Sequence, residues 1–266
     1  MAWWGKLLGG AFGFMIGGPL GALIGAAVGH NLDAGLKRTG GPWQEGMGFD
    51  RQERTQTAFF TATFSVMGHV AKADGRVSPD EINLAEQLMQ QMGLSDSLRE
   101  VARRLFNEGK ASDFPLDDVL DQFRIECRAS SNLLRMFVEI QLQAVFADGE
   151  VHRAERELLA YIAEKLRLPP SELNHLEAML RAGPQWHGGK ASGQRLSNLD
   201  DAYAVLGIKA DAADDDVKRA YRRLMSQHHP DKLVSKGLPE EMMKMATQKT
   251  QEIKAAYEQV KEARGT

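Results

Sequence analysis

The chain is poor in the residues that build several kinds of covalent or ionic centre. Its 266 residues include one cysteine, Cys127, which excludes an intrachain disulfide framework and a zinc centre made from several thiolates. Acidic and basic side chains nearly balance, with a formal net charge of -3 and a pI near 6.2. No broad basic field is therefore available for nucleic acid or for an anionic membrane surface, and we expect no nucleic-acid partner. Any basic recognition must be local.

Long alternating runs of β-branched residues are also absent, and this argues against a β-sheet. Apolar residues recur instead at helical spacing between residues 51 and 182. We therefore predict an all-α fold with a central helical bundle at 51–182, in which Pro115, Pro169 and Pro170 separate helices. The expected core positions at helical spacing include Phe123, Leu133, Leu134, Phe137, Ile140 and Leu142.

Charged side chains are missing from residues 7–29. At about 1.5 Å per residue, a helix of this length spans a hydrocarbon core of about 30 Å. The alternative is a cleaved signal peptide, which has a shorter apolar region and a small-residue cleavage site. We predict a transmembrane anchor at 1–31 and a glycine-rich juxtamembrane linker at 32–50. Lys37, Arg38, Arg51 and Arg54 follow the anchor and favour a cytoplasmic location for the rest of the chain.

Glycine recurs at every fourth position of this apolar segment, which gives one side of a helix a low relief. Such a surface lets two membrane helices approach closely, so we expect the chain to form a homodimer in the bilayer. The expected contact residues are Gly9, Gly13, Gly17, Gly21 and Gly25. Two alternatives stay open, a bent and weakly packed anchor, and a hairpin that turns at residues 17–19 without crossing the membrane.

The central region contains an internal repeat. The pattern Ala-Asp-Gly-x-Val occurs at 73–77 and again at 147–151, and each copy is followed by a glutamate. One hypothesis is that Asp74, Glu81, Asp148 and Glu155 converge on a hard divalent cation. The preferred interpretation is turn and helix-cap duty, since the acid spacing of an EF-hand is missing. We therefore expect neither a metal nor a cofactor. The repeat resembles the tellurite-resistance TerB-like domain, which implies a helical bundle of this size.

A second unit is expected at residues 199–266, after a Gly- and Ser-rich flexible linker at 183–198 that lets it reach away from the bundle. A short helix contains Tyr203 and ends at Gly207, and a second helix begins at Asp214. Pro230 ends that helix and places His229 and Asp231 on a loop. A third helix, at about 239–263, returns along the second and packs Met242, Met245, Ile253, Ala256, Tyr257 and Val260 against it.

These elements resemble the J-domain. The matching pieces are Tyr203-x-x-Leu206-Gly207-Ile208, the basic segment Tyr221-Arg222-Arg223-Leu224, His229-Pro230-Asp231, and Glu252-Ile253-x-x-Ala256-Tyr257. The resemblance implies that the unit binds a DnaK-type chaperone and stimulates ATP hydrolysis by that partner. The chain itself is then not an enzyme. The residues expected to bind the chaperone are His229, Pro230, Asp231, Lys218, Arg219, Arg222, Arg223 and Lys232.

An apolar anchor, a TerB-like bundle and a terminal J-domain, in this order, resemble the DjlA family of bacterial inner-membrane co-chaperones. The resemblance implies a single membrane crossing with a periplasmic N-terminus, cytoplasmic C-terminal domains, and a role in envelope or capsule signalling. Like that family, the sequence lacks a Gly/Phe-rich segment and a four-cysteine zinc module. Two alternative classes stay open. One is a membrane-tethered metal or stress sensor that uses the central carboxylates. The less favoured one is an enzyme, although no nucleophile-base arrangement, phosphate-binding glycine loop or metal signature stands out. The sequence does not identify the client proteins.

Overall fold

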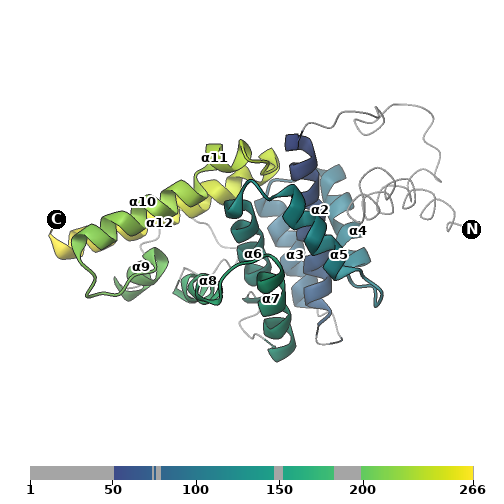
Figure 1. Ribbon diagram of the computed structural model, residues 1–266, viewed down its shortest axis with the longest axis horizontal. Helices are drawn as coiled ribbons and strands as arrows, with labels where there is room; N and C mark the ends of the chain where they lie inside the picture. The colour runs from purple at the N-terminus through teal and green to yellow at the C-terminus, as the bar shows by residue number, and fades with distance from the viewer. Residues whose placement is uncertain (1–50, 74, 76–78, 147–151, 183–198, 266) are drawn as a thin grey trace, which may run out of the picture.

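The computed structural model describes residues 51–73, 75, 79–146, 152–182 and 199–265 (Figure 1). Every regular element in these residues is a helix, which confirms the predicted all-α fold. The predicted membrane anchor, its glycine contacts and both linkers lie outside the described residues. Within the described ranges, no helix has the combination of length and apolar composition that a bilayer crossing requires.

The described helices form a central bundle and a C-terminal hairpin (Figure 1). The bundle contains α2 (Arg51–Ala71), α3 (Pro79–Gln91), α4 (Asp96–Gly109), α5 (Leu116–Glu126), α6 (Ser131–Phe146), α7 (Arg153–Lys165) and α8 (Pro170–Ala182). The C-terminal part contains α9 (Leu199–Leu206), α10 (Asp214–His228), α11 (Pro230–Val234), the 3-10 turn η2 (Glu240–Met242) and α12 (Met243–Arg264).

Helix α2 is the central element of the bundle, and it contacts α4, α5, α6 and α7. It buries threonine and serine side chains as well as apolar ones, so these hydroxyl groups need internal partners. Thr63 donates to the carbonyl of Phe59 at 2.7 Å, and Ser65 donates to the carbonyl of Thr61 at 2.8 Å. The helix backbone therefore satisfies hydroxyl groups that water cannot reach.

Aromatic rings connect three helices of the bundle. The ring of Phe123 on α5 lies 6.0 Å from that of Phe59 on α2 and 4.7 Å from that of Phe137 on α6, measured between centroids. All the core positions predicted from helical spacing are buried: Phe123, Leu133, Leu134, Phe137, Ile140 and Leu142. The sequence prediction of this core is confirmed.

The C-terminal hairpin has its own apolar core, made by α9, α10 and α12. The rings of Tyr221 and Tyr257 stack with centroids 4.2 Å apart, which joins α10 to α12. At the far end, the Arg264 guanidinium donates to the Tyr203 hydroxyl, to the carbonyls of Ala210 and Ala212, and to the Asp214 carboxylate. One arginine thus joins the end of α12 to the α9–α10 connection. The predicted antiparallel hairpin is confirmed.

The loop end of this hairpin packs on the central bundle. Five of its apolar residues belong to the bundle's core cluster: Leu233, Leu238, Met242, Met245 and Ala246. The prediction that Met242 and Met245 pack against the second helix is therefore wrong. With 22 residues, α12 is longer than α10 with 15, and its first turns extend past the end of α10 onto the bundle. The C-terminal unit is docked in this structure, whereas the sequence suggested a unit that reaches away.

Two glycines set the distance between α2 and α4. A Cβ atom added to Gly109 would lie 1.8 Å from the carbonyl oxygen of Ser65, and one added to Gly68 would lie 1.9 Å from that of Phe106. Neither carbonyl can rotate away, because both belong to helix backbones. The helices therefore approach closely only because these side chains are absent.

We expect Gly109→Ala to lower the free energy of unfolding by about 1–3 kcal/mol, because the methyl group would push two helix backbones apart. Denaturant unfolding of the full-length protein in detergent measures this change. The control is Asn107→Ala at an exposed position of the same helix, for which we expect a change of less than about 0.5 kcal/mol. An equal effect of the two substitutions would contradict the role assigned to Gly109.

Candidate functional site

The His-Pro-Asp segment joins α10 to α11. His229 has an extended backbone, with φ -60° and ψ 123°. It is both the C-cap residue of α10 and the N-cap residue of α11. Pro230 occupies the first position of α11, where its fixed φ suits a helix and its missing N–H leaves no bond unmade. The sequence predicted a loop, whereas the structure has a short helix. Asp231 therefore lies in a helical first turn, and its exposed carboxylate has no ion pair within the described residues.

The predicted basic residues share the exposed face of α10. Lys218, Arg219, Arg222 and Arg223 are all exposed, and of these Arg219 also pairs with Asp216 at 3.1 Å. Lys232 extends the same surface from α11, since its Nζ donates to the Ser226 hydroxyl on α10 at 2.9 Å. The predicted cations thus follow the exposed face of α10 from Lys218, in its second turn, to Arg223, and Lys232 continues this surface on α11 next to the exposed Asp231. A surface of this kind suits an acidic partner surface that also presents a cation to Asp231.

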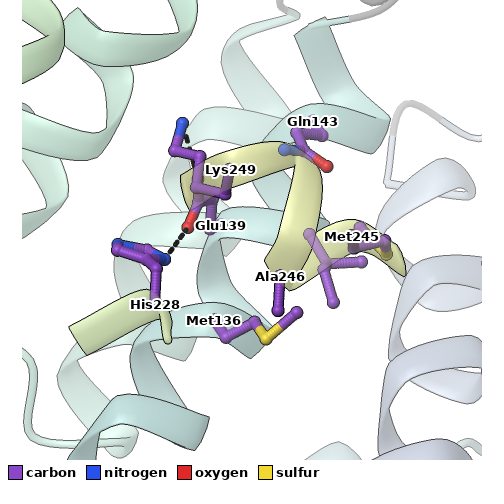
Figure 2. A pocket seen from close by; sticks show the side chains of 8 residues that line it. Met136, Glu139, Gln143, His228, Met245, Ala246 and Lys249 are labelled. Atoms are coloured by element: carbon purple, nitrogen blue, oxygen red, sulfur yellow. Dashed lines mark ion pairs between the residues drawn. The ribbon is translucent and has the colours of Figure 1, made fainter. Parts of the chain in front are cut away.

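The opposite side of the same segment is buried against α6. His228, the last residue of α10, is only 3% exposed, and its Nδ1 lies 3.8 Å from Oε2 of Glu139 (Figure 2). The Lys249 Nζ on α12 lies 2.9 Å from Oε1 of Glu139 and 3.2 Å from Oε2 of Glu252. We call His228, Glu139, Lys249 and Glu252 the interhelix charge cluster. It joins the end of the His-Pro-Asp-bearing helix to the central bundle.

The space beside this cluster is too small for a ligand. Its volume is about 10 Å³, and methionine and alanine side chains close it on one side (Figure 2). A volume of about 10–15 Å³ is the lower limit for one water molecule. The cluster is therefore a packed interface and not a binding cavity.

Burial and mutual attraction act in opposite directions on the pKa values of the cluster. Burial alone would raise the pKa of the Glu139 carboxyl, but the Lys249 ammonium and His228 hold it below its ordinary value. Burial alone would lower the pKa of Lys249, but the carboxylates of Glu139 and Glu252 hold it above its ordinary value. For His228 burial dominates over the attraction of Glu139 and lowers the pKa to about 4. The cluster at neutral pH thus contains the Lys249 ammonium between two carboxylates, those of Glu139 and Glu252, and a neutral imidazole.

A second contact joins the C-terminal unit to the bundle. The His175 ring on α8 lies against Gly207 at the end of α9, where an added Cβ would be 1.9 Å from Cε1 of the ring. Gly207 also has φ 65°, so it both ends the helix and admits the ring. Burial lowers the pKa of His175. This histidine packs between two units, as expected for a structural residue.

The proposed metal residues are only partly described. Asp74 and Asp148 lie outside the described residues, and the side chain of Glu81 does too. Glu155 is buried, and its Oε2 accepts a hydrogen bond from the backbone N–H of His152 at 2.9 Å, which caps the start of α7. Among the residues that the structure places, no group of three or more His, Cys, Asp or Glu side chains is close enough to hold a metal ion.

The sequence analysis missed Glu139, Lys249 and the role of His228. A signal for the first two was present. Glu139 shares its helix face with Met136 and Leu142, the buried apolar residues three positions before and after it. Lys249 lies four residues from both Met245 and Ile253, and therefore shares the inward face of α12 with them. A lone charge on each of two inward faces indicates a buried pair, although the pattern does not say which helices meet.

A short helix, a basic helix that ends at His-Pro-Asp, and a long helix that returns along it together define a J-domain. Residues 201–264 match the family model "DnaJ domain", residues 60–178 match "Tellurite resistance protein TerB", and residues 1–39 match "Co-chaperone DjlA transmembrane domain". The matches occur in the order that the sequence analysis expected.

Full-length relatives carry the same arrangement. The chain is 47% identical to the co-chaperone protein DjlA of Coxiella burnetii, over 99% of both chains. It is 45% identical to that of Salmonella typhimurium and 43% identical to that of Escherichia coli O157:H7, in each case over 100% of this chain and 99% of the relative. No solved structure matches the chain. The chain belongs to the DjlA family of membrane-anchored J-domain co-chaperones.

We expect Lys249→Met to destabilise the protein by about 3–5 kcal/mol, because it leaves the Glu139 carboxylate buried without its main partner. The double variant Glu139→Leu with Lys249→Met removes both charges and should be more stable than the single variant. Denaturant unfolding of the full-length chain in detergent compares them, with Lys254→Met at an exposed position of α12 as the control. A single variant no less stable than the double would contradict the buried pair.

The buried His228 imidazole should make stability depend on pH. Its folded pKa, about 4, lies below the ordinary value of 6.5, so the unfolded chain binds the proton more readily between these values. The contribution of the neutral His228 imidazole to the free energy of unfolding is therefore complete above about pH 6.5 and is lost as the pH falls towards 4. Relative to His228→Gln, we expect the wild type to lose on the order of 3 kcal/mol of unfolding free energy over this window. Unfolding curves of both proteins at several pH values test this, and a pH-independent difference would refute it.

Proposed function

We propose that this co-chaperone stimulates ATP hydrolysis by a DnaK-type chaperone and delivers that chaperone to client proteins at the bacterial inner membrane. The exposed Asp231 carboxylate is the observation that carries the proposal. It has no ion pair within the described residues, and it is exposed next to Lys232, directly after the helix that carries the exposed α10 cations. The docking of the C-terminal unit leaves this surface uncovered.

The proposed mechanism uses charge complementarity and no chemistry on this chain. The cations of α10 and Lys232 would steer the hairpin towards an acidic surface of the chaperone. Asp231 would then form a charge-assisted pair with a cation of the chaperone's ATPase domain, and this contact would favour the hydrolysing state. His229 and Pro230 would hold the start of α11 so that Asp231 has a fixed position. The ATPase site belongs to the partner.

We further infer how the chain is placed in the membrane. A single crossing with the N-terminus in the periplasm would put the J-domain in the cytoplasm, where a DnaK-type chaperone and ATP are present. The basic residues Lys37, Arg38, Arg51 and Arg54 support this orientation. Dimerisation through Gly9, Gly13, Gly17, Gly21 and Gly25 would place two J-domains side by side. A contribution to envelope or capsule signalling rests on family resemblance.

The test is the single-turnover ATPase rate of a DnaK-type chaperone mixed with the full-length chain in bilayer discs. We expect Asp231→Asn to lower the stimulation about ten- to hundredfold, because a hydrogen bond to a charged group contributes about 1.5–3 kcal/mol. His229→Gln should also lower the stimulation of the ATPase rate, because loss of the imidazole would displace Asp231.

The matched control is Asp215→Asn, which makes the same change at another exposed position of the hairpin. We expect it to stimulate like the wild type. Circular dichroism and unfolding curves would establish that all variants fold. Full stimulation by a folded Asp231→Asn variant would overturn the proposal, and so would a wild-type chain that binds the chaperone without changing its rate.

A further inference from the structure

The central bundle has an arginine-rich pocket that the J-domain function does not use. It has a volume of about 430 Å³ and lies between the α5–α6 connection and the α7–α8 connection. Its wall contains four arginines and one acidic residue, Glu172. The arginines are Arg124, Arg128, Arg135 and Arg167. We call this site the arginine pocket, and its apolar surface comes mainly from leucines.

The positive charge of the pocket is only partly compensated. Arg135 pairs with Glu172 at 2.6 Å, and Arg124 pairs with Asp121 at 3.2 Å. Arg128 and Arg167 are exposed, and neither has an ion pair or a side-chain hydrogen bond within the described residues. Two guanidinium groups are thus available to an anion. Arginine suits phosphate because its planar donors match two phosphate oxygens at once.

The backbone at Arg167 supports a role for its side chain. With φ 60°, it is the one non-glycine residue in the left-handed region among the residues that the structure describes. It follows the end of α7, at the position where helices usually have glycine. Glycine would adopt this conformation with less strain, so the presence of an arginine makes this position a candidate for a functional side chain.

The start of α6 adds to the attraction for an anion. This helix begins at Ser131, which lies in the pocket wall. The first N–H groups of a helix lack intrahelical partners and carry a partial positive charge. The dipole of a 16-residue helix therefore acts in the same direction as the arginines.

The pocket is close to the point where the chain comes from its membrane anchor. The Thr55 hydroxyl in the first turns of α2 donates to the carbonyl of Glu126 at 3.2 Å, and Arg54 pairs with the Glu126 carboxylate at 3.6 Å. Glu126 lies between two pocket residues, Ile125 and Arg128. The membrane-domain match ends at residue 39 and α2 begins at Arg51. Even fully extended, residues 40–50 reach only about 40 Å.

We propose that the arginine pocket binds the phosphate headgroup of an anionic phospholipid in the membrane that anchors the chain. Charge complementarity, the short connection to the anchor and the exposed Ile125 favour a membrane lipid as the source of the phosphate. The side chain of Ile125 is 55% exposed at the pocket rim, where it can contact the lipid surface. Binding would orient the bundle on the membrane and, through the docked hairpin, would orient the J-domain as well.

The test uses the full-length chain in bilayer discs with a fluorophore at Ile125→Cys. Burial raises the pKa of the native Cys127 thiol, so this cysteine should not take up the label. A headgroup-bound quencher reports docking in discs of phosphatidylcholine alone and in discs that also contain phosphatidylglycerol. We expect strong quenching only with the anionic lipid. Arg128→Gln combined with Arg167→Gln should lower the ratio of docked to undocked bundle by about fivefold for each arginine.

The matched control is Lys72→Gln combined with Arg153→Gln, which removes the same charge at exposed positions. The pocket lies beside the start of α2 and the end of α7. Lys72 follows the end of α2 and Arg153 begins α7, so both control positions are remote from the pocket. An equal loss of quenching in the control variant would overturn the proposal, because the loss would then follow from the lower net positive charge and not from the pocket. Quenching of equal strength with and without phosphatidylglycerol would also overturn the proposal.

Inorganic phosphate distinguishes the lipid from a soluble ligand. If phosphate bound the pocket with the same affinity in both kinds of disc and the quenching never depended on phosphatidylglycerol, the site would belong to a free phosphate compound. In phosphatidylcholine discs, the Arg128 and Arg167 variant should stimulate the partner's ATPase like the wild type, because neither residue belongs to the chaperone-binding surface. A failed lipid test with normal ATPase stimulation would thus leave the proposed function intact.

Discussion

The buried pair of Glu139 and Lys249 fixes how the J-domain sits on the rest of the molecule. Two charges that leave water are tolerated only when each has its partner at close range, and here Lys249 lies 2.9 Å from Glu139 and 3.2 Å from Glu252. An apolar contact tolerates sliding, whereas a buried ion pair is satisfied at one register. The register of α12 on α6 therefore depends on this pair, and the apolar contacts of Leu233, Leu238 and Met245 follow from it.

This docking separates the two sides of α10. His228 belongs to the buried side and the α10 cations belong to the exposed side. Because Pro230 starts a new helix directly after His229, the Asp231 carboxylate lies only three residues from a side chain held by the bundle. The position of Asp231 thus depends on an interface that His228, three residues before it, helps to form. A J-domain on a free tether would not have this fixed orientation.

The same interface brings the His-Pro-Asp segment close to the start of α2. Near the start of α2, the Gln52 amide donates to the carbonyl of Val234 at 3.5 Å, and Thr55 lies so close to Gly237 that an added Cβ would be 2.5 Å from its methyl group. The segment that follows His-Pro-Asp therefore lies beside α2, the first helix that the structure describes (Figure 1). Under the proposed function, this arrangement would place the partner chaperone near the membrane surface.

The sequence by itself determined the helical fold, the core of the bundle and the J-domain hairpin, because these depend on local spacing. Helical periodicity placed Phe123 and Phe137 in the core, and Gly207 and Pro230 marked helix boundaries through their own backbone preferences. Only the tertiary structure decided that Lys249 meets Glu139, that His228 is buried, and that Arg124, Arg128, Arg135 and Arg167 surround one pocket. These groups come from separate helices and connections. Periodicity states which face of a helix is buried, but the partner of that face is chosen by packing between segments far apart in the chain.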